Sequence, residues 1–338
     1  MRAVGRAALA LAIALAWSQP APAQSGGLPA LGADPARVSV SGLSSGAFMA
    51  VQYGVAFSSE TMGVGVVAGG PFDCAEVTPF GSAACMQGSP SGAKSYEAAQ
   101  RLAASGEIDP LTNLKTQRIY LFRGFWDPVV DREVMDAVRD FYALAGAPSA
   151  HVQYVTTVKA GHGFVSRSST EACVATRLPF VVGCEVGGAK YDQPKEILTQ
   201  IYGPLQPKAD TLSATPEAFD QSEFAPAAGM AAEGYVYVPA ACGARGARCA
   251  VHIVFHGCWQ SAVLTQDAVY GQLGYNEWAD SNRVIMLYPQ VDPSWAPPNP
   301  IGCWDWWGYT GSKFPTRSGA QLTAVRAMAH RLLAAPPP

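Results

Sequence analysis

Runs of β-branched and apolar residues alternate along the chain with stretches in which apolar residues recur at helical spacing. Val38 and Val40 begin an alternating run that ends at Gly42, and the small apolar stretch 47–57 favours a helix directly afterwards. Residues 62–68 are nearly all apolar, which is typical of a strand covered on both faces. The same patterns predict strands at 118–122 and 151–158 and helices at 91–104 and 131–144.

A segment rich in Ala, Pro, Glu and Asp interrupts this alternation at 203–232 and is interpreted as a connector. The pattern resumes with strands at 235–238 and 251–255. The turn between Cys242 and Cys249 that joins them predicts a hairpin. A further helix, strand and helix are expected at 266–281, 283–288 and 319–333. Strands separated by helices predict an α/β fold, with a mostly parallel sheet flanked by helices.

The first 23 residues have the layout of a secretory signal peptide. Arg2 and Arg6 give a positive start, residues 7–17 are apolar but too short to span a bilayer, and Ala21-Pro22-Ala23 is a cleavage signal. The alternative is a buried N-terminal helix. We expect a secreted or periplasmic chain that has no membrane contact after cleavage, since no other stretch is long and apolar enough to span a bilayer.

The composition fits one large domain. Of 338 residues, 49% are hydrophobic and 14% are charged, and the formal net charge is −3. This is enough for a single core over 24–335. The alternative is two domains, 37–202 and 233–335, joined by the connector 203–232. No basic stripe with interleaved aromatic residues is present, so nucleic acid is not an expected partner.

Eight cysteines fit an oxidising, exported setting. Their spacing predicts three local disulfides and one long-range disulfide, although eight cysteines allow 105 pairings. A zinc site is not expected, because no Cys-x2-Cys pair occurs and the histidines are scattered. The expected pairs are Cys74–Cys85, Cys173–Cys184, Cys242–Cys249 and Cys258–Cys303.

Reactive side chains follow three of the predicted strands. Ser44 stands between glycines in the segment 42–46, Asp127 lies in a Gly- and Pro-bounded turn, and His162 lies between two glycines. The carboxyl ends of parallel strands share one edge of the sheet, and serine, acid and histidine follow the α/β-hydrolase order. The alternatives are turn-forming roles, with Asp131 as a rival acid.

The order of the motifs is rotated relative to that hydrolase order. Several strands and a His-Gly loop normally precede the nucleophile, whereas here His256-Gly257 follows Ser44 by more than 200 residues. Moving 233–335 in front of residue 37 restores the usual order. The sequence therefore predicts a circularly permuted α/β-hydrolase in which 203–232 joins the original ends.

Six motifs stand out along the chain: Ser41–Gly46, Gly69–Phe72, the Asp127 turn, Gly161-His162, His256–Gln260 and Gly302–Tyr309. Together they resemble those of secreted polyhydroxybutyrate (PHB) depolymerases whose oxyanion loop follows the triad. The resemblance implies that Ser44, Asp127 and His162 form a catalytic triad. It also implies that the backbone N–H groups of Ser45 and Cys258 form the oxyanion hole.

The resemblance implies a serine esterase that hydrolyses poly(3-hydroxybutyrate) or its oligomers through an acyl-enzyme. The expected partner is this polyester or a hydroxyalkanoate oligomer, with no cofactor and no metal, and the chain is expected to be a monomer. No separate polymer-binding domain follows residue 335, which favours soluble or amorphous substrate. The alternatives are a secreted carboxylesterase acting on feruloyl or acetyl esters and a non-catalytic polymer-binding protein.

An aromatic cluster follows Cys303. If a disulfide joins Cys303 to the oxyanion loop, Trp304, Trp306 and Trp307 lie near the catalytic edge. They are candidates for an apolar wall around the acyl group, since not all of them can point inward from one strand face. The alternative is packing in the core. Asp305, between them, is expected to be structural.

Overall fold

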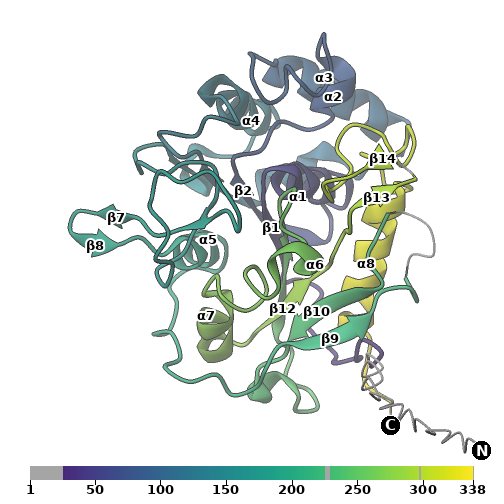
Figure 1. Ribbon diagram of the computed structural model, residues 1–338. Coiled ribbons are helices and arrows are strands. Elements are labelled where there is room, and N and C mark those ends of the chain that lie inside the picture. The colour runs from purple at the N-terminus through teal and green to yellow at the C-terminus, as the bar shows by residue number, and fades with distance from the viewer. Residues whose placement is uncertain (1–25, 225–228, 297, 338) are drawn as a thin grey trace, which may run out of the picture.

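One mixed sheet organises the part of the chain described by the structure, a computed structural model covering residues 26–224, 229–296 and 298–337. The expected signal peptide, 1–23, lies outside the described residues. The sheet has eight strands in the order β4-β3-β2-β1-β11-β12-β10-β9, and only the pairs made by β10 are antiparallel. Figure 1 shows β12, β10 and β9 side by side. The strands are β1 (Val38–Leu43), β2 (Thr61–Val67), β3 (Arg118–Phe122), β4 (Val152–Val155), β9 (Glu217–Asp220), β10 (Glu233–Tyr237), β11 (Ala250–Phe255) and β12 (Val284–Tyr288).

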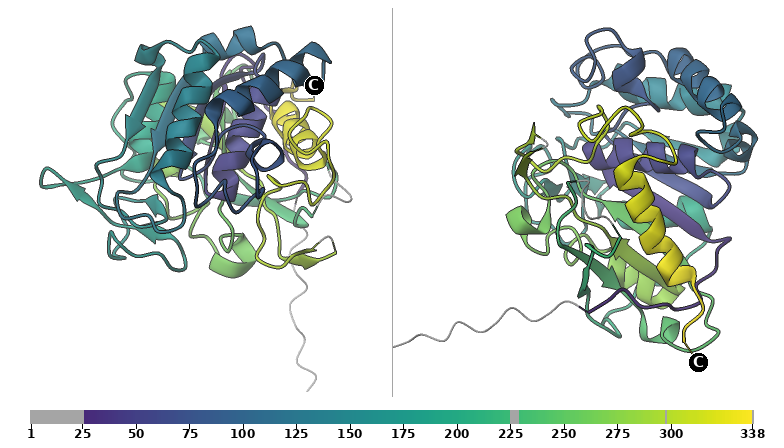
Figure 2. Two further views of the ribbon diagram at one scale, coloured as in Figure 1. Left: turned by 90° about the horizontal axis from the view of Figure 1, so that it is seen from above. Right: turned by 90° about the vertical axis from the view of Figure 1, so that its right-hand side faces the viewer.

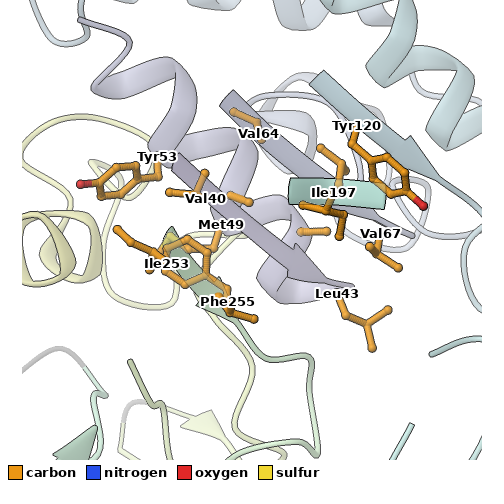
Figure 3. Close-up of a cluster of buried hydrophobic side chains, with 14 of the residues drawn as sticks. Val40, Leu43, Met49, Tyr53, Val64, Val67, Tyr120, Ile197, Ile253 and Phe255 are labelled. Atoms are coloured by element: carbon orange, nitrogen blue, oxygen red, sulfur yellow. The ribbon is translucent and has the colours of Figure 1, made fainter. Parts of the chain in front are cut away.

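Strand β1 lies in the interior of this sheet, and all of its residues are buried. It pairs in parallel with β2 on one side and β11 on the other, so that Val40 stands opposite Val64 and Ile253. Side chains from these strands and from the helix after β1 pack into one core (Figure 3). Because β11 comes from the second half of the chain, both halves contribute to the same sheet and core.

Helices cover both faces of the sheet (Figure 2). On β2, Val64 approaches α1, while its neighbours Gly63 and Gly65 approach α5. Successive side chains of a strand point to opposite faces, so α1 and α5 lie on opposite sides of the sheet. The helices are α1 (Ser45–Ala56), α2 (Cys74–Val77), α3 (Gly92–Ala104), α4 (Arg132–Leu144), α5 (Gln193–Tyr202), α6 (Ala262–Thr265), α7 (Tyr275–Asn282) and α8 (Ala320–Leu333).

Short elements complete the described chain. Three 3₁₀ turns precede β3, β4 and β11, and three two-stranded ribbons lie outside the main sheet. The turns are Leu111–Lys115, Ser149–His151 and Ala240–Cys242. The ribbons are β5 (Phe164–Val165) with β6 (Val181–Val182), β7 (Glu185–Val186) with β8 (Ala189–Lys190), and β13 (Ser294–Trp295) with β14 (Pro298–Asn299).

The predicted hairpin between β10 and β11 is wrong. β10 pairs with β12 and β9, and β12 lies between β10 and β11. The Cys242–Cys249 turn reverses the chain as expected. However, a turn reverses only the chain direction, and a strand from later in the sequence occupies the position beside β10.

The expected connector and one expected helix also differ from the structure. The segment 203–232 contains β9, whose buried Phe219 stands between residues of higher exposure and gives too short a pattern to detect. The predicted helix 266–281 is broken, because Gln266 and Gly274 adopt φ values of 54° and 99° that an α-helix does not allow. Two short helices, α6 and α7, lie on either side of this break.

The predicted circular permutation is confirmed. Read from β9 round to β4, only β11 and β12 exchange places relative to chain order. The two ends of the described chain lie side by side, because the N–H groups of Leu31 and Ala33 donate to the carbonyl of Leu332. The N–H of Gly32 also donates to the carbonyl of Ala334, at 2.8 Å. The original ends therefore join between α5 and β9. The second half of the chain thus begins at β9, before the residue 233 that was expected from the sequence.

Candidate active site

Ser44 occupies a strained turn between β1 and α1. Its φ of 56° and ψ of −122° lie outside the regions that L-residues prefer. Its N–H donates to the carbonyl of Val67 on β2, which fixes the turn to the neighbouring strand. A Cβ at Gly42 would lie 2.2 Å from the carbonyl oxygen of Gly46, so only glycine permits this turn. The half-buried serine therefore stands at the carboxyl edge of the sheet.

Gly46 joins this turn to the loop after β11. A Cβ at Gly46 would lie 2.3 Å from the carbonyl oxygen of His256 and 2.4 Å from that of Phe255. The first turn of α1 therefore contacts the backbone of the His-Gly loop directly. Residues that are more than 200 positions apart in the sequence are adjacent at this point because Gly46 has no side chain.

His162 and Asp127 form a buried pair. The Nδ1 of His162 lies 2.9 Å from the Oδ2 of Asp127, and their side chains are only 6% and 1% exposed. The other carboxylate oxygen of Asp127, Oδ1, accepts the N–H groups of Val129 and Val130 at 2.8 and 3.0 Å. Because both carboxylate oxygens have hydrogen-bond partners, the carboxylate has a fixed orientation. It contacts the imidazole only at Nδ1, which leaves Nε2 available as a base.

Backbone contacts hold the acid turn against the histidine loop. The N–H of Trp126 donates to the carbonyl of Ala160, two residues before His162, at 3.0 Å. Arg123 donates from its guanidinium to the carbonyl of Asp127 at 2.9 Å. A Cβ at Gly124 would lie 2.4 Å from the carbonyl oxygen of Ala160. The two loops therefore pack backbone to backbone.

The loop after β11 is fixed on three sides. A disulfide joins Cys258 to Cys303, and the N–H of Trp259 donates to the carbonyl of Ile301 at 2.7 Å. His256 is wholly buried, and burial lowers its pKa from 6.5 to about 4, so this imidazole is neutral at pH 7. Its Nε2 accepts the N–H of Val291 at 3.1 Å. The position of the Cys258 backbone is therefore set by covalent and hydrogen bonds.

The four disulfides of the structure are the pairs expected from cysteine spacing. Three of them close short loops, and the fourth spans 45 residues between the loop after β11 and the aromatic cluster. No free cysteine occurs in the part of the chain that the structure describes. The bonds are Cys74–Cys85, Cys173–Cys184, Cys242–Cys249 and Cys258–Cys303.

The candidate residues thus gather at one edge of the sheet. Ser44 follows β1, Asp127 follows β3, His162 follows β4 and Cys258 follows β11. Among the described residues, the Ser44 hydroxyl makes no hydrogen bond to a protein group, and such catalytic contacts often tighten only when substrate binds. No group of three metal-ligating side chains occurs in the described ranges, and no described helix is long and apolar enough to cross a membrane.

Comparison with family models gives no match, but whole-chain comparisons are decisive. A polyhydroxybutyrate depolymerase of Talaromyces funiculosus is 36% identical over 314 residues, which cover 88% of this chain and 90% of the relative. The chain belongs to the PHB depolymerase family. A poly(3-hydroxybutyrate) depolymerase of Delftia acidovorans is 40% identical over 90% of this chain. This chain spans 61% of the length of that PHB depolymerase.

Solved PHB depolymerase structures have the same fold. The crystal structure of PHB depolymerase from Penicillium funiculosum superposes with a TM-score of 0.84 at 35% identity, over 91% of this chain and 98% of that one. A serine-to-alanine PHB depolymerase variant complexed with an R3HB trimer gives 0.85 at 34% identity, with the same coverage. The α/β-hydrolase fold predicted from the sequence is therefore confirmed.

The tryptophan prediction needs correction. Trp304 is fully buried and packs against Phe255 and His256, so its expected place on a cleft wall is wrong. Trp306 is only 4% exposed and stacks on Phe48, 4.1 Å between ring centroids. The physical reason is that the segment is an irregular loop and not a strand, so side chains do not alternate between two faces. Trp307 is half-buried and stays a candidate.

Asp305 is structural, as expected. Its Oδ1 accepts the N–H groups of Trp307, Gly308 and Tyr309, and its Oδ2 accepts both the N–H and the hydroxyl of Thr310. This buried carboxylate therefore holds the aromatic loop in shape.

Sequence reasoning missed a second serine–histidine cluster inside this PHB depolymerase fold. His252 on β11 contacts the hydroxyl of Ser39 at 2.7 Å through Nδ1 and that of Ser41 at 2.8 Å through Nε2. Tyr202 and Tyr275 extend the network to α5 and α7. All three central residues have no exposed surface, so substrate cannot reach them. The period-two spacing of the serines on β1 was the signal that could have identified this network.

Proposed function

We propose that this chain is a serine esterase that hydrolyses poly(3-hydroxybutyrate) or its oligomers through an acyl-enzyme. Ser44 is the nucleophile, His162 the general base and Asp127 the orienting acid. The observation that carries the proposal is the buried His162–Asp127 pair, at 2.9 Å, on the same sheet edge as the strained Ser44 turn. Family membership supports the same reaction class.

The reaction proceeds in two steps, acylation of Ser44 and hydrolysis of the acyl-enzyme. The Nε2 of His162 takes the Ser44 proton while Oγ attacks the ester carbonyl, and the same proton then goes to the leaving alcohol. Water attacks the acyl-enzyme with His162 again as base, which releases the hydroxy acid and restores Ser44. The N–H groups of Ser45 and Cys258 stabilise both tetrahedral oxyanions, and one lost donor typically costs about 3–4 kcal/mol of transition-state stabilisation.

The substrate proposal has two supports. The relatives are named for this polymer, and a related structure holds an R3HB trimer. Trp307, half-buried beside the Cys303 segment, is proposed to contact the methyl groups of the acyl unit. Its replacement by alanine should raise KM more than it lowers kcat.

The decisive experiment is product analysis on amorphous poly(3-hydroxybutyrate) with the wild-type chain and Ser44→Ala. We expect soluble 3-hydroxybutyrate products from wild type and none above background from the variant, at an unchanged melting temperature. Release of ferulate or acetate without any 3-hydroxybutyrate would assign the enzyme to other esters. Activity that survives in Ser44→Ala would overturn the mechanism, and binding without any hydrolysis would make the chain a polymer-binding protein.

We also propose that the chain is exported through a signal peptide cleaved after Ala23 and acts as a monomer. The four disulfides support an oxidising destination, either periplasmic or extracellular. N-terminal sequencing of the mature protein and its mass by light scattering test the two statements separately. An uncleaved N-terminus or a dimer mass would contradict them.

A further inference from the structure

Gln260 links the loop after β11 (256–260, the oxyanion loop) to Pro179 and Phe180 by hydrogen bonds from both ends of its side-chain amide. Its Oε1 accepts the N–H of Gly257, the residue before Cys258, at 2.7 Å. Its Nε2 donates to the carbonyls of Pro179 and Phe180, at 2.8 and 3.2 Å. The side chain is 1% exposed, so water cannot replace these bonds readily.

The far end of this bridge lies against the catalytic histidine. The carbonyl of Phe180 also accepts the N–H of Phe164, two residues after His162, at 2.9 Å. The Phe180 ring stands edge-on to the His162 ring, with centroids 6.3 Å apart. Phe180 is therefore joined to the histidine loop by backbone and ring contacts, and to the oxyanion loop by Gln260.

The bridge crosses the catalytic edge between two groups that must act on the same ester group. The Cys258 N–H has to meet the oxyanion, while His162 has to meet the hydroxyl and then the leaving oxygen. These two loops come from β11 and β4, which are separated in the sheet by β1, β2 and β3. In the described sheet β4 and β11 are therefore not paired with each other, and the sheet connects the two loops only through three intervening strands.

We infer that Gln260 is a positioning residue, which fixes the distance between the oxyanion donor and the general base. This inference rests on the proposed function. Displacement of preorganised groups by a fraction of an ångström weakens the transition state more than the ground state. Loss of the bridge should therefore lower kcat and leave KM nearly unchanged.

Gln117 provides a matched control. Its amide is also fully buried and donates to two carbonyls, those of Gly54 and Thr61, at 2.7 and 3.1 Å. These carbonyls belong to the end of α1 and the start of β2, away from the catalytic edge. Gln117→Ala removes two amide-to-carbonyl hydrogen bonds, as Gln260→Ala does, whereas Gln260→Ala also removes the bond from the Gly257 N–H. Only Gln260 faces the proposed site.

The test compares the two alanine variants and Gln260→Glu on a soluble p-nitrophenyl ester, well below their melting temperatures. We expect both alanine variants to lose stability, but only Gln260→Ala to lose about 10- to 100-fold in kcat, a partial loss of one oxyanion donor. In Gln260→Glu, the carboxyl can donate only when protonated, and then with its single O–H to one of the two carbonyls. The ratio of its kcat to that of wild type should therefore rise as the pH is lowered from about 8 to about 5.5.

Equal kcat values for Gln260→Ala and Gln117→Ala, or a Gln260→Glu ratio that does not change with pH, would overturn the positioning role. Neither result would affect the proposed hydrolysis, which fails only if wild type is inactive or Ser44→Ala is active. A rise in KM with kcat unchanged would assign Gln260 to substrate binding, and would also overturn the inference.

Discussion

At the scale of single residues, the structure distinguishes groups that the sequence leaves equivalent. Asp127 and Asp131 lie four positions apart in the same turn region. Only Asp127 contacts His162, while Asp131 precedes α4 and its side chain makes no capping hydrogen bond. Two carboxylates of equal chemistry therefore have different environments, because only Asp127 lies within hydrogen-bond distance of the imidazole.

Replacing these two acids tests that distinction. Asp127→Asn should lower kcat about 10⁴-fold, because an amide N–H facing Nδ1 favours the wrong imidazole tautomer. Asp131→Asn should leave kcat within about threefold, since substitutions away from buried networks have small effects. Steady-state kinetics on a soluble ester measures both. A larger loss from Asp131→Asn would exchange the two assignments.

A second residue-scale prediction concerns Gly46. An alanine Cβ would stand 2.3 Å from the His256 carbonyl oxygen, so the Ser44 turn and the loop after β11 must move apart. Gly46→Ala should therefore reduce the free energy of unfolding by about 1–3 kcal/mol and also reduce kcat. Gly243→Ala is the control, because its Cβ would meet nothing closer than 3.6 Å. Urea unfolding and kinetics give the two readouts, and a fully active Gly46→Ala would contradict the expected displacement.

At the scale of elements, β1 and β11 are joined by the His252 network as well as by their backbone ladder. Burial lowers the pKa of His252 from 6.5 to about 3. As the pH falls below 6.5 the unfolded chain gains this proton while the folded chain does not, so folding stability is lost down to about pH 3. Burial therefore keeps the imidazole between Ser39 and Ser41 neutral in the folded chain.

Removing the imidazole tests this linkage. His252→Asn keeps polar atoms beside the serines but binds no proton in either state. Near pH 5 the slope of unfolding free energy against pH should therefore be smaller than in wild type by about 1.4 kcal/mol per pH unit, which is one proton. Urea unfolding between about pH 4.5 and 6 measures the slope. Equal slopes would mean that folded His252 takes up its proton as readily as the unfolded chain does.

The Cys258–Cys303 disulfide links two loops at the same scale. A double Cys→Ser change should cost about 4 kcal/mol by the chain-entropy relation for a 45-residue loop, and should lower kcat because it frees the Cys258 amide. The Cys242–Cys249 bond closes a loop of 7 residues and lies away from the proposed site. Its removal should cost about 2 kcal/mol and leave kcat unchanged. Thermal unfolding and kinetics separate the two effects. Equal kcat values in both variants would show that the first bond has no influence on the site.

At the scale of the whole molecule, the sheet runs in nearly sequential order from β9, through the meeting chain ends, to β4. The ends meet through hydrogen bonds from 31–33 to 332–334, and the segment before β9 is mostly exposed. We therefore expect fold and site to depend on which strands are neighbours, and not on where the chain begins.

A reversed permutant tests this independence. The new chain would open between Asp210 and Thr211 and join Ala335 to Leu28 through a flexible Gly/Ser linker of about ten residues. We expect the four disulfides, a far-ultraviolet circular dichroism spectrum like that of wild type and kcat within about threefold, because exposed positions tolerate new ends. Peptide mapping, circular dichroism and ester hydrolysis are the measurements. A permutant that folds but is inactive would mean that the native order itself shapes the site.

Much of the fold follows from local pattern. The Val-rich strands, the glycines around Ser44 and the Gly- and Pro-bounded turn at Asp127 are local signals, and each is read within a few residues. The order of these signals is enough to predict a rotated hydrolase. β9 is missed because Phe219 alone marks its buried face, and the hairpin error arises because neighbouring strands need not be consecutive in the chain.

The sequence by itself determined which side chains are candidates for the chemistry and roughly where each strand ends, because these depend on residue type and short-range spacing. Only the tertiary structure decided which groups meet. Backbone contacts between Gly46 and His256, the choice of Asp127 over Asp131, the burial of Trp304 and the Gln260 bridge all join segments distant in sequence. Such contacts arise from how the core packs, and no local pattern encodes them.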